Sequence, residues 1–228
     1  MKNVLKVVSI ILAIVLICLS PCVLTACNAP SEIEVSNIDE LKSALETQNE
    51  VIKLKANISS EESIYITKKI TFDLNGKTLQ GSGYDGVFCV GENGELTIQG
   101  EGKVIANEVN NYAMAIWAKS NSKVTINGGE FSQQVTGTDD QYDLIYAKDS
   151  AVITINGGTF NSVTPQWTLN IYDKDNKVAK FVVKGGKFKD YDPANSLTEP
   201  KDVAANFVAE GFKSRLIENS IYYEVVKA

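Results

Sequence analysis

The chain has 228 residues, 44% of them hydrophobic, and its 22 Lys and Arg against 28 Asp and Glu give a net charge of −6. This composition excludes a disordered chain. The acidic balance also argues against nucleic acid as a partner, because an acidic surface repels a phosphate backbone. The chain contains no histidine, and Arg215 is its one arginine.

Residues 1–26 are predicted to be a lipoprotein signal peptide. A short positive region over residues 1–6 precedes an apolar run over residues 7–23. The run ends at Leu24-Thr25-Ala26-Cys27, which resembles a bacterial lipobox. The resemblance implies cleavage before Cys27 and attachment of lipid to its thiol; a plain signal peptide and an uncleaved anchor helix are the alternatives.

The mature chain is therefore expected outside the cell, anchored by its N-terminal lipid to the outer face of a bacterial membrane. Residues 27–36 are polar and include Pro30, which predicts a short tether. Loss of the leader leaves 20 basic and 28 acidic residues, a net charge of −8. Cys89 is then the one cysteine without lipid, so no disulfide framework is expected.

A helix is predicted to begin after Asn37 and to end near Glu46. Asn37 can cap this helix, and Glu40 follows it at the spacing of a capping box. The apolar stripe consists of Ile38, Leu41 and Leu45. Such a helix is expected to cover the open end of a repeat stack, where apolar side chains and a free strand edge would otherwise meet water.

The central part of the chain is a repeat. Residues 124–131, Val-Thr-Ile-Asn-Gly-Gly-Glu-Phe, return as residues 153–160 and again, more changed, as residues 181–188. The first glycines of successive copies are 29 and 28 residues apart. A fixed period in this range indicates stacked units, each of which buries its apolar face only against its neighbours.

Each unit contains short β-branched strands and sharp turns, with no room for a crossover helix. About five units are predicted, with turns at Gly76, Gly100, Gly128, Gly157 and Gly185. Winding such units gives an all-β fold, a single-stranded parallel β-helix in which like residues stack about 4.8 Å apart. The expected stacks are Ile126, Ile155 and Val183, and Phe131, Phe160 and Phe188.

Two features carry a resemblance to a known family. Residues 70–79, Ile-Thr-Phe-Asp-Leu-Asn-Gly-Lys-Thr-Leu, and the Asn-Gly-Gly-X-Phe turns resemble right-handed parallel β-helix surface proteins of the pectate-lyase-like architecture. The resemblance covers residues 51–190 and implies a β-helix, with its capping helix, over residues 37–191. It implies no single activity, because this scaffold carries lyases, hydrolases, adhesins and binding proteins.

Residues 192–228 are predicted to form a C-terminal cap made of a helix and a hairpin. The helix is expected over residues 200–209, with Gly211 ending it. Residues 214–216 and 221–226 are expected to pair as the hairpin. A separate binding module is the alternative, although a segment of under about 40 residues without cysteines rarely folds alone.

Catalytic residues are not expected. The lyases of this scaffold need basic groups in a groove, whereas the one arginine, Arg215, lies in the predicted cap. The hydrolases of the same scaffold place aspartates beside a histidine, and this chain has no histidine. The nearest carboxylate group is Asp139, Asp140 and Asp143, in a polar stretch that indicates a solvated loop. No metal site and no cofactor are predicted.

An aromatic ladder is predicted on the outside of the solenoid. Alignment of the strands by their glycine turns places Phe88, Ile116 and Ile145 at one inward position. The residues that follow them face outward: Cys89, Trp117 and Tyr146, joined by Tyr172 if a two-residue insertion is allowed after it. Tyr112, Tyr142 and Trp167 are expected to flank this ladder. Exposed aromatic rings bind sugar rings, but the alternative is that these rings pack under the cap or under long loops.

The sequence favours a cell-surface lipoprotein without catalytic activity that binds glycan or mediates adhesion through Trp117, Tyr146 and Tyr172. The alternative from another class is a polysaccharide lyase or glycoside hydrolase of the same fold with a degenerate or unrecognised site. A passive spacer is the third possibility.

Overall fold

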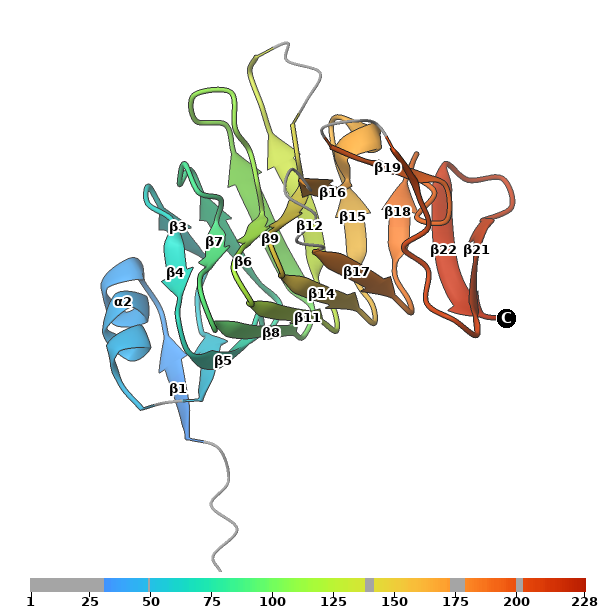
Figure 1. Cartoon of the computed structure of the whole chain (residues 1–228). Coiled ribbons are helices and arrows are strands. Elements are labelled where there is room, and N and C mark those ends of the chain that lie inside the picture. The colour runs from blue at the N-terminus through green and yellow to red at the C-terminus, as the bar shows by residue number, and fades with distance from the viewer. Residues whose placement is uncertain (1–30, 49, 138–141, 173–178, 200–202) are drawn as a thin grey trace, which may run out of the picture.

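The computed structural model describes residues 31–48, 50–137, 142–172, 179–199 and 203–228. Within these residues the chain is a parallel β-helix whose short strands stack into three sheets (Figure 1). Helix α2 (Ile38–Glu46) lies at one end, and a hairpin of β21 (Phe212–Leu216) and β22 (Tyr222–Lys227) lies at the other. The expected signal peptide and Cys27, the expected lipidation site, lie outside the described residues.

Sheet A contains the strands that precede the predicted glycine turns. Its order is β1-β2-β5-β8-β11-β14-β17, and neighbouring strands are parallel. The strands are β1 (Glu32–Val35), β2 (Val51–Leu54), β5 (Lys69–Asp73), β8 (Glu95–Gln99), β11 (Lys123–Ile126), β14 (Val152–Ile155) and β17 (Lys180–Val183). Neighbours in this sheet are three strands apart along the chain from β2 onward, so the chain winds once per rung as predicted.

Sheets B and C take the other two strands of each rung. Sheet B has the order β21-β22-β18-β15-β12-β9-β6-β3, and sheet C has the order β16-β13-β10-β7-β4. The parallel strands of sheet B are β3 (Ile58–Ser60), β6 (Lys77–Gly81), β9 (Gly102–Asn107), β12 (Glu130–Gln134), β15 (Thr159–Asn161) and β18 (Lys187–Lys189). Those of sheet C are β4 (Ile64–Ile66), β7 (Phe88–Val90), β10 (Ile116–Ala118), β13 (Ile145–Lys148) and β16 (Leu169–Tyr172).

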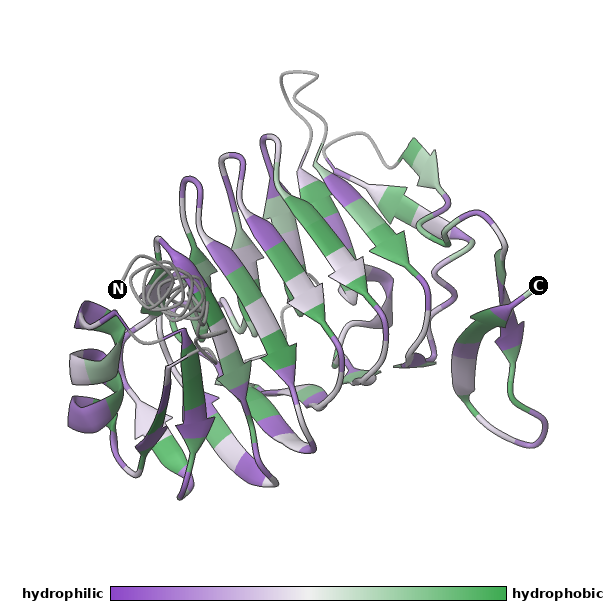
Figure 2. Ribbon diagram, turned by 90° about the horizontal axis from the view of Figure 1, so that it is seen from below, coloured by the Kyte–Doolittle hydropathy of each residue, from purple (hydrophilic) through white to green (hydrophobic). Residues whose placement is uncertain are grey.

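The core is a set of columns of like side chains. Strand residues alternate between buried and solvent-facing positions, and the hydropathy bands in Figure 2 follow that alternation. Ile155 pairs with Ile126 on one side and with Val183 on the other, and all three are buried. The rings of Phe131, Phe160 and Phe188 stack with centroid separations of 5.2 and 4.8 Å. Both predicted columns are therefore confirmed.

The glycine turns are held by close contact between rungs. A β-carbon at Gly157 would lie 2.8 Å from the carbonyl oxygen of Asn127, so the rung below leaves no space for a side chain. Asn156 Nδ2 donates to Asn127 Oδ1 at 2.9 Å, which joins the turns of two neighbouring rungs. The amide of Asn75, in an earlier turn, donates instead to the Leu54 carbonyl oxygen at 2.8 Å.

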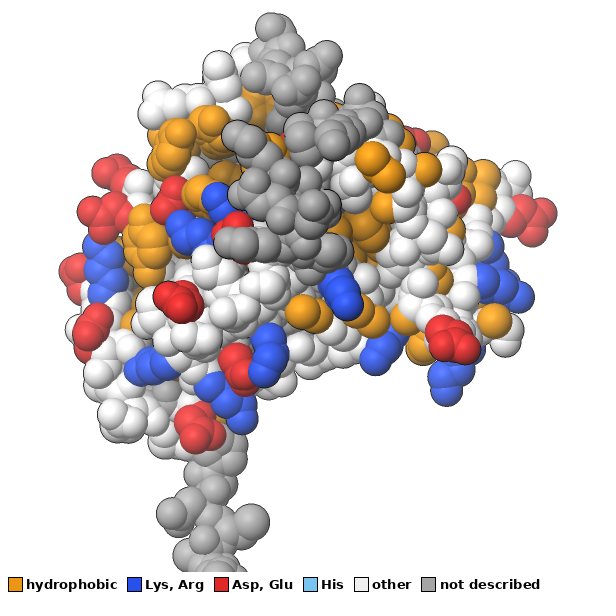
Figure 3. All heavy atoms as spheres, in the orientation of Figure 1, with side chains coloured by type: hydrophobic (Ala, Val, Ile, Leu, Met, Phe, Trp, Pro, Cys, Tyr) orange, Lys and Arg blue, Asp and Glu red, His pale blue; other side chains and the backbone are white. Residues whose placement is uncertain are grey.

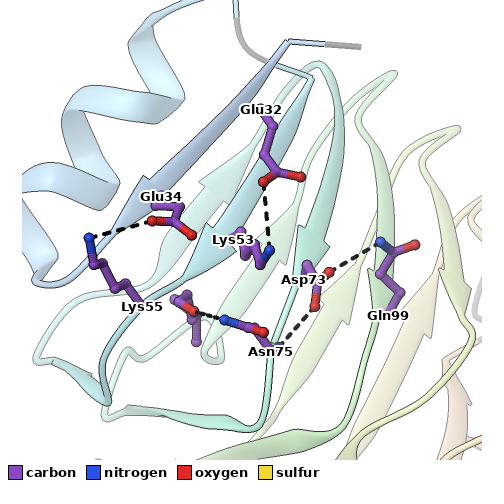
Figure 4. A network of polar contacts seen from close by, with 8 residues as sticks. Glu32, Glu34, Lys53, Lys55, Asp73, Asn75 and Gln99 are labelled. Atoms are coloured by element: carbon purple, nitrogen blue, oxygen red, sulfur yellow. Dashed lines mark hydrogen bonds and ion pairs between the residues drawn. The ribbon is translucent and has the colours of Figure 1, made fainter. Parts of the chain in front are cut away.

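The outer face of sheet A is covered by polar contacts between rungs. Figure 4 shows Lys53 beside Glu32 and Lys55 beside Glu34, with N–O distances of 3.7 and 3.5 Å. Lys123 pairs in the same way with Glu95, at 2.7 Å. Opposite charges on neighbouring strands stabilise a sheet modestly and leave its charged groups neutralised.

The N-terminal helix forms as predicted. The Glu40 backbone N–H donates to Asn37 Oδ1 at 2.9 Å, and the Glu40 carboxylate accepts from the Ser36 backbone N–H at 2.7 Å. Leu41 and Ala44 are buried, and the helix packs beside β1 and β3. Four of the residues assigned to the tether instead form β1, whose parallel pairing with β2 makes it the first strand of sheet A.

The C-terminal hairpin is confirmed, but the predicted helix over residues 200–209 is wrong for the residues that the structure describes. Val203–Ala205 form β20, which pairs antiparallel with β19 (Ser196–Thr198). Val208 then forms a parallel bridge with Val183 at the end of sheet A. The last strand of a stack exposes unpaired backbone groups, and an extended segment can pair with them where a helix cannot.

We predict that Gly157→Ala lowers the free energy of unfolding by about 1–3 kcal/mol, because the added methyl group has to push two rungs apart. The matched control is Gly91→Ala, whose β-carbon would have its nearest neighbours at 3.9 Å. That variant should change the stability by less than about 1 kcal/mol. Urea denaturation measures both, and equal stabilities would contradict the steric account of the turn.

Candidate functional site

The outer face of sheet C carries a row of side chains that includes three aromatic residues. Successive strands place Tyr65 beside Cys89, Cys89 beside Trp117, Trp117 beside Tyr146, and Tyr146 beside Asn170. We call this row of five residues the aromatic face. Each step is one strand spacing of about 4.8 Å, so Trp117 and Tyr146 are direct neighbours, and Tyr65 lies two spacings from Trp117 with Cys89 between them.

Tyr172 does not follow Tyr146 in this row, which corrects the predicted ladder. Tyr172 pairs with Lys148, and Asn170 takes the position beside Tyr146. A short 3-10 turn, Pro165–Trp167, leads into β16, so that Leu169 rather than Ile171 lies opposite Ile145. The register therefore differs from the prediction by two residues. Because side chains alternate with a period of two, Tyr172 stays on the predicted outer face, at the next outward-facing position along its strand.

Tyr65 is a member of the aromatic face that the sequence analysis missed. Its side chain is 57% exposed, whereas Trp117 and Tyr146 are half-buried and Cys89 is fully buried. The predicted row begins at the strand of Phe88 and therefore leaves out β4, the strand that carries Tyr65. The signal was present, because Ile64-Tyr65-Ile66 repeats the pattern of Ile116-Trp117-Ala118, a large aromatic residue between two inward apolar residues.

Two further exposed tyrosines lie on loops beside this row. Tyr84 and Tyr112 are 53% and 44% exposed, and their rings meet edge to face with centroids 4.9 Å apart. Tyr84, Tyr65 and Asp85 also line a cleft of about 630 Å³ between helix α2 and the first rung. In Figure 3, hydrophobic and aromatic side chains reach the surface on the side of the molecule where β4 and β7 lie. Tyr112 therefore lies at the surface where the sequence placed a flanking ring.

The other two expected flanking rings are buried. Trp167 belongs to the 3-10 turn before β16, and Tyr142 packs in the core with its hydroxyl donating to Glu108 Oε1 at 2.8 Å. The Glu108 carboxylate also accepts the backbone N–H groups of Thr136 and Gly137, and these bonds lower the pKa of Glu108 to about 2. Tyr142 and Glu108 are therefore structural, because they fix a loop beside the solenoid.

Charged side chains hold the aromatic face in place. Asp85 Oδ2 accepts from the Tyr65 hydroxyl at 3.1 Å and lies 3.7 Å from Lys119 Nζ. The same ammonium lies over the Trp117 ring, 4.2 Å from its centroid, and Lys148 Nζ lies 5.7 Å from that centroid. The rings of Trp117 and Tyr146 are tilted, with centroids 6.1 Å apart. Aromatic, cationic and anionic groups thus meet on one surface.

A polar pair, the buried Asn170 and the half-buried Asp143, lies at the C-terminal end of the row. Asn170 is fully buried and donates from Nδ2 to Asp143 Oδ1 at 2.8 Å, while Asn170 Oδ1 is buried without a hydrogen-bond partner. Burial raises the pKa of Asp143 to about 8, although the Asn170 hydrogen bond opposes that shift. Asp143 is half-buried, so its carboxyl is less solvated than the predicted loop implied. The two aspartates grouped with it, Asp139 and Asp140, lie outside the described residues.

Comparison of the chain with models of protein families, with curated proteins and with solved structures finds no match in any of the three. Within the described residues, no group of three or more His, Cys, Asp or Glu is placed to hold a metal ion. No helix in that part of the chain has both the length and the apolar character needed to span a membrane.

We predict that Asp143→Asn removes a pH dependence of stability. The carboxyl keeps its proton in the folded state up to pH about 8, whereas its unfolded pKa is near 3.8. Between these values the folded state binds the extra proton, so raising the pH destabilises the wild-type chain by up to about 1.4 kcal/mol per unit relative to the variant. Urea denaturation from pH 4 to 8 measures this difference. If the free energy of unfolding depends on pH in the same way for the two proteins, the raised pKa of Asp143 is contradicted.

Proposed function

We propose that this protein is an exported, lipid-anchored surface protein that binds glycan without catalysis through the aromatic face of sheet C. The observation that carries the proposal is the row of Tyr65, Trp117 and Tyr146 on successive or near-successive rungs. Rings presented at the surface bind the apolar faces of sugars, and hydrogen-bonding groups beside the rings give orientation. Asp85 and Lys119 supply such groups.

The contrast with sheet A supports the choice of face. On sheet A, the lysines Lys53, Lys55 and Lys123 each have a carboxylate partner on a neighbouring strand. A ligand would gain little free energy from these paired lysines, because each already has an opposite charge beside it and exposed ion pairs are weak in water. Exposed aromatic surface, by contrast, gains free energy when a ligand covers it.

One observation favours the alternative of a glycoside hydrolase. Asp143 holds its proton near neutral pH, which is a property of general acids in such enzymes. Against this role, Asp143 is half-buried and its carboxyl accepts a hydrogen bond from the fully buried Asn170. Incubation with a panel of polysaccharides, followed by assay for new reducing ends and for unsaturated products, separates the two functions, because turnover of any member would overturn the binding function.

The proposal for the aromatic face predicts that Trp117→Ala combined with Tyr65→Ala weakens binding on a glycan array roughly 5- to 100-fold, from the loss of two ring contacts. The unfolding midpoint should change little, because Tyr65 is exposed and Trp117 is half-buried. Leu216→Ala is the control, since Leu216 is 54% exposed on the hairpin away from sheet C. Unchanged binding in the double variant would remove the aromatic face as the site.

The lipobox resemblance supports the anchoring part of the proposal, and Cys27→Ala tests it. We expect the wild-type chain to enter the detergent phase on Triton X-114 partitioning and to carry an acylated N-terminal cysteine by mass spectrometry. Cys27→Ala should lose the acyl group and should keep its leader or leave the membrane. Cys89→Ala is the matched control and should stay acylated. An unmodified Cys27 in the mature wild-type chain would contradict the anchor.

A further inference from the structure

Two lysines lie side by side on the aromatic face. The strand register pairs Trp117 with Tyr146 and Ala118 with Ala147, so the next residues, Lys119 and Lys148, occupy neighbouring positions on adjacent rungs. Alternation along the strand places both on the same outward face as the two rings. Both ammonium groups approach the Trp117 ring, at 4.2 and 5.7 Å from its centroid.

This arrangement is unfavourable in the absence of an anion. Like charges directly opposite each other on neighbouring strands destabilise a sheet. Asp85 lies 3.7 Å from Lys119, whereas Lys148 takes part in none of the salt bridges between described residues. Asp149, the next residue along, points its Oδ2 toward the Ser120 hydroxyl at 3.5 Å. Elsewhere on the solenoid, neighbouring charges have opposite signs, as in Lys103 with Glu130 on sheet B.

The Lys119 ammonium also affects what can bind at the indole. It lies over the Trp117 ring, which attracts it as a cation–π partner. An uncharged sugar has to displace this ammonium without offering a charge in return. A ligand with a negative group offers the lysine a charge-assisted hydrogen bond, which is the stronger interaction, and so exposes the ring for stacking.

On the basis of the glycan-binding function proposed above, we propose that the ligand is an acidic saccharide. Its carboxylate or sulfate group lies between Lys119 and Lys148, and the adjoining sugar ring packs against Trp117. Tyr65 and Tyr146 then lie on either side along the row, in position for the neighbouring sugar units. The acidic net charge of the whole chain does not oppose this assignment, because distant surface charges are screened and the two lysines outnumber Asp85 where the ligand binds.

The test uses glycan pairs that differ only by one acidic group. Lactose, 3′-sialyllactose and 3′-sulfolactose are printed on an array with other neutral and acidic pairs, and titrations are run on the pairs that give a signal. We expect the acidic member of a bound pair to bind at least about tenfold more tightly than the neutral member. Raising NaCl from 50 to 500 mM should reduce this preference severalfold.

Lysine variants assign the preference to the site. Lys148→Gln and Lys119→Gln should each remove most of the acidic preference, and Lys148→Arg should retain it because the charge is kept. Lys180→Gln is the control, since Lys180 is an exposed lysine on β17 of sheet A. Because Lys148 and Lys119 lie on the outer face, circular dichroism should show the variants folded.

The outcomes separate this inference from the function on which it rests. Neutral and acidic members bound equally, or an acidic preference that survives Lys148→Gln, would overturn the acidic ligand and leave glycan binding in place. Absence of binding to every saccharide on the array would overturn the proposed function, and the acidic ligand with it.

Discussion

The structure depends on hydrogen bonds between parallel strands that repeat at one spacing along a single axis. This spacing forces each side chain to lie on its counterpart in the next rung, so a core position has to suit both of its neighbours at once. Phe131, Phe160 and Phe188 satisfy this requirement as a stack of rings. The same constraint fixes Gly157, where the carbonyl oxygen of the rung below occupies the space of a side chain. The repeat in the sequence is thus a direct consequence of contact between rungs.

The repeat explains why much of the fold could be predicted. Alternation of two identifies the inward residues, and the spacing of the glycine turns gives the register of sheet A, as Ile126 and Ile155 show. Prediction failed where the repeat changes. The length of the turn before β16 is set by its 3-10 geometry, so the strand register of Tyr172 could not be read from glycine spacing. The extended conformation of residues 203–209 could not be predicted either, because it depends on pairing with other strands and not on a local sequence pattern.

In the candidate site, too, strand positions could be predicted from the sequence and side-chain contacts could not. Alternation placed Trp117 and Tyr146 outward and side by side, and the structure brings them together as expected. The contact of Lys119 and Lys148 with the indole was not recognised, because it depends on how long side chains lie across neighbouring rungs. The raised pKa of Asp143 was also missed, since a polar stretch in the sequence gives no sign of how far a carboxyl is desolvated in the folded chain. Backbone register is encoded locally, whereas side-chain environment is a property of the assembled stack.

The pairing of Val208 with Val183 has a consequence for the length of the molecule. A stack built from equivalent rungs has no internal reason to stop, because its last strand presents the same hydrogen-bonding template as every strand before it. Termination therefore has to come from a segment that departs from the repeat. The backbone around Phe207 and Ala209 occupies that template by exchanging hydrogen bonds with Val183. These backbone groups of Val183 are therefore not available to pair with a strand of a second chain.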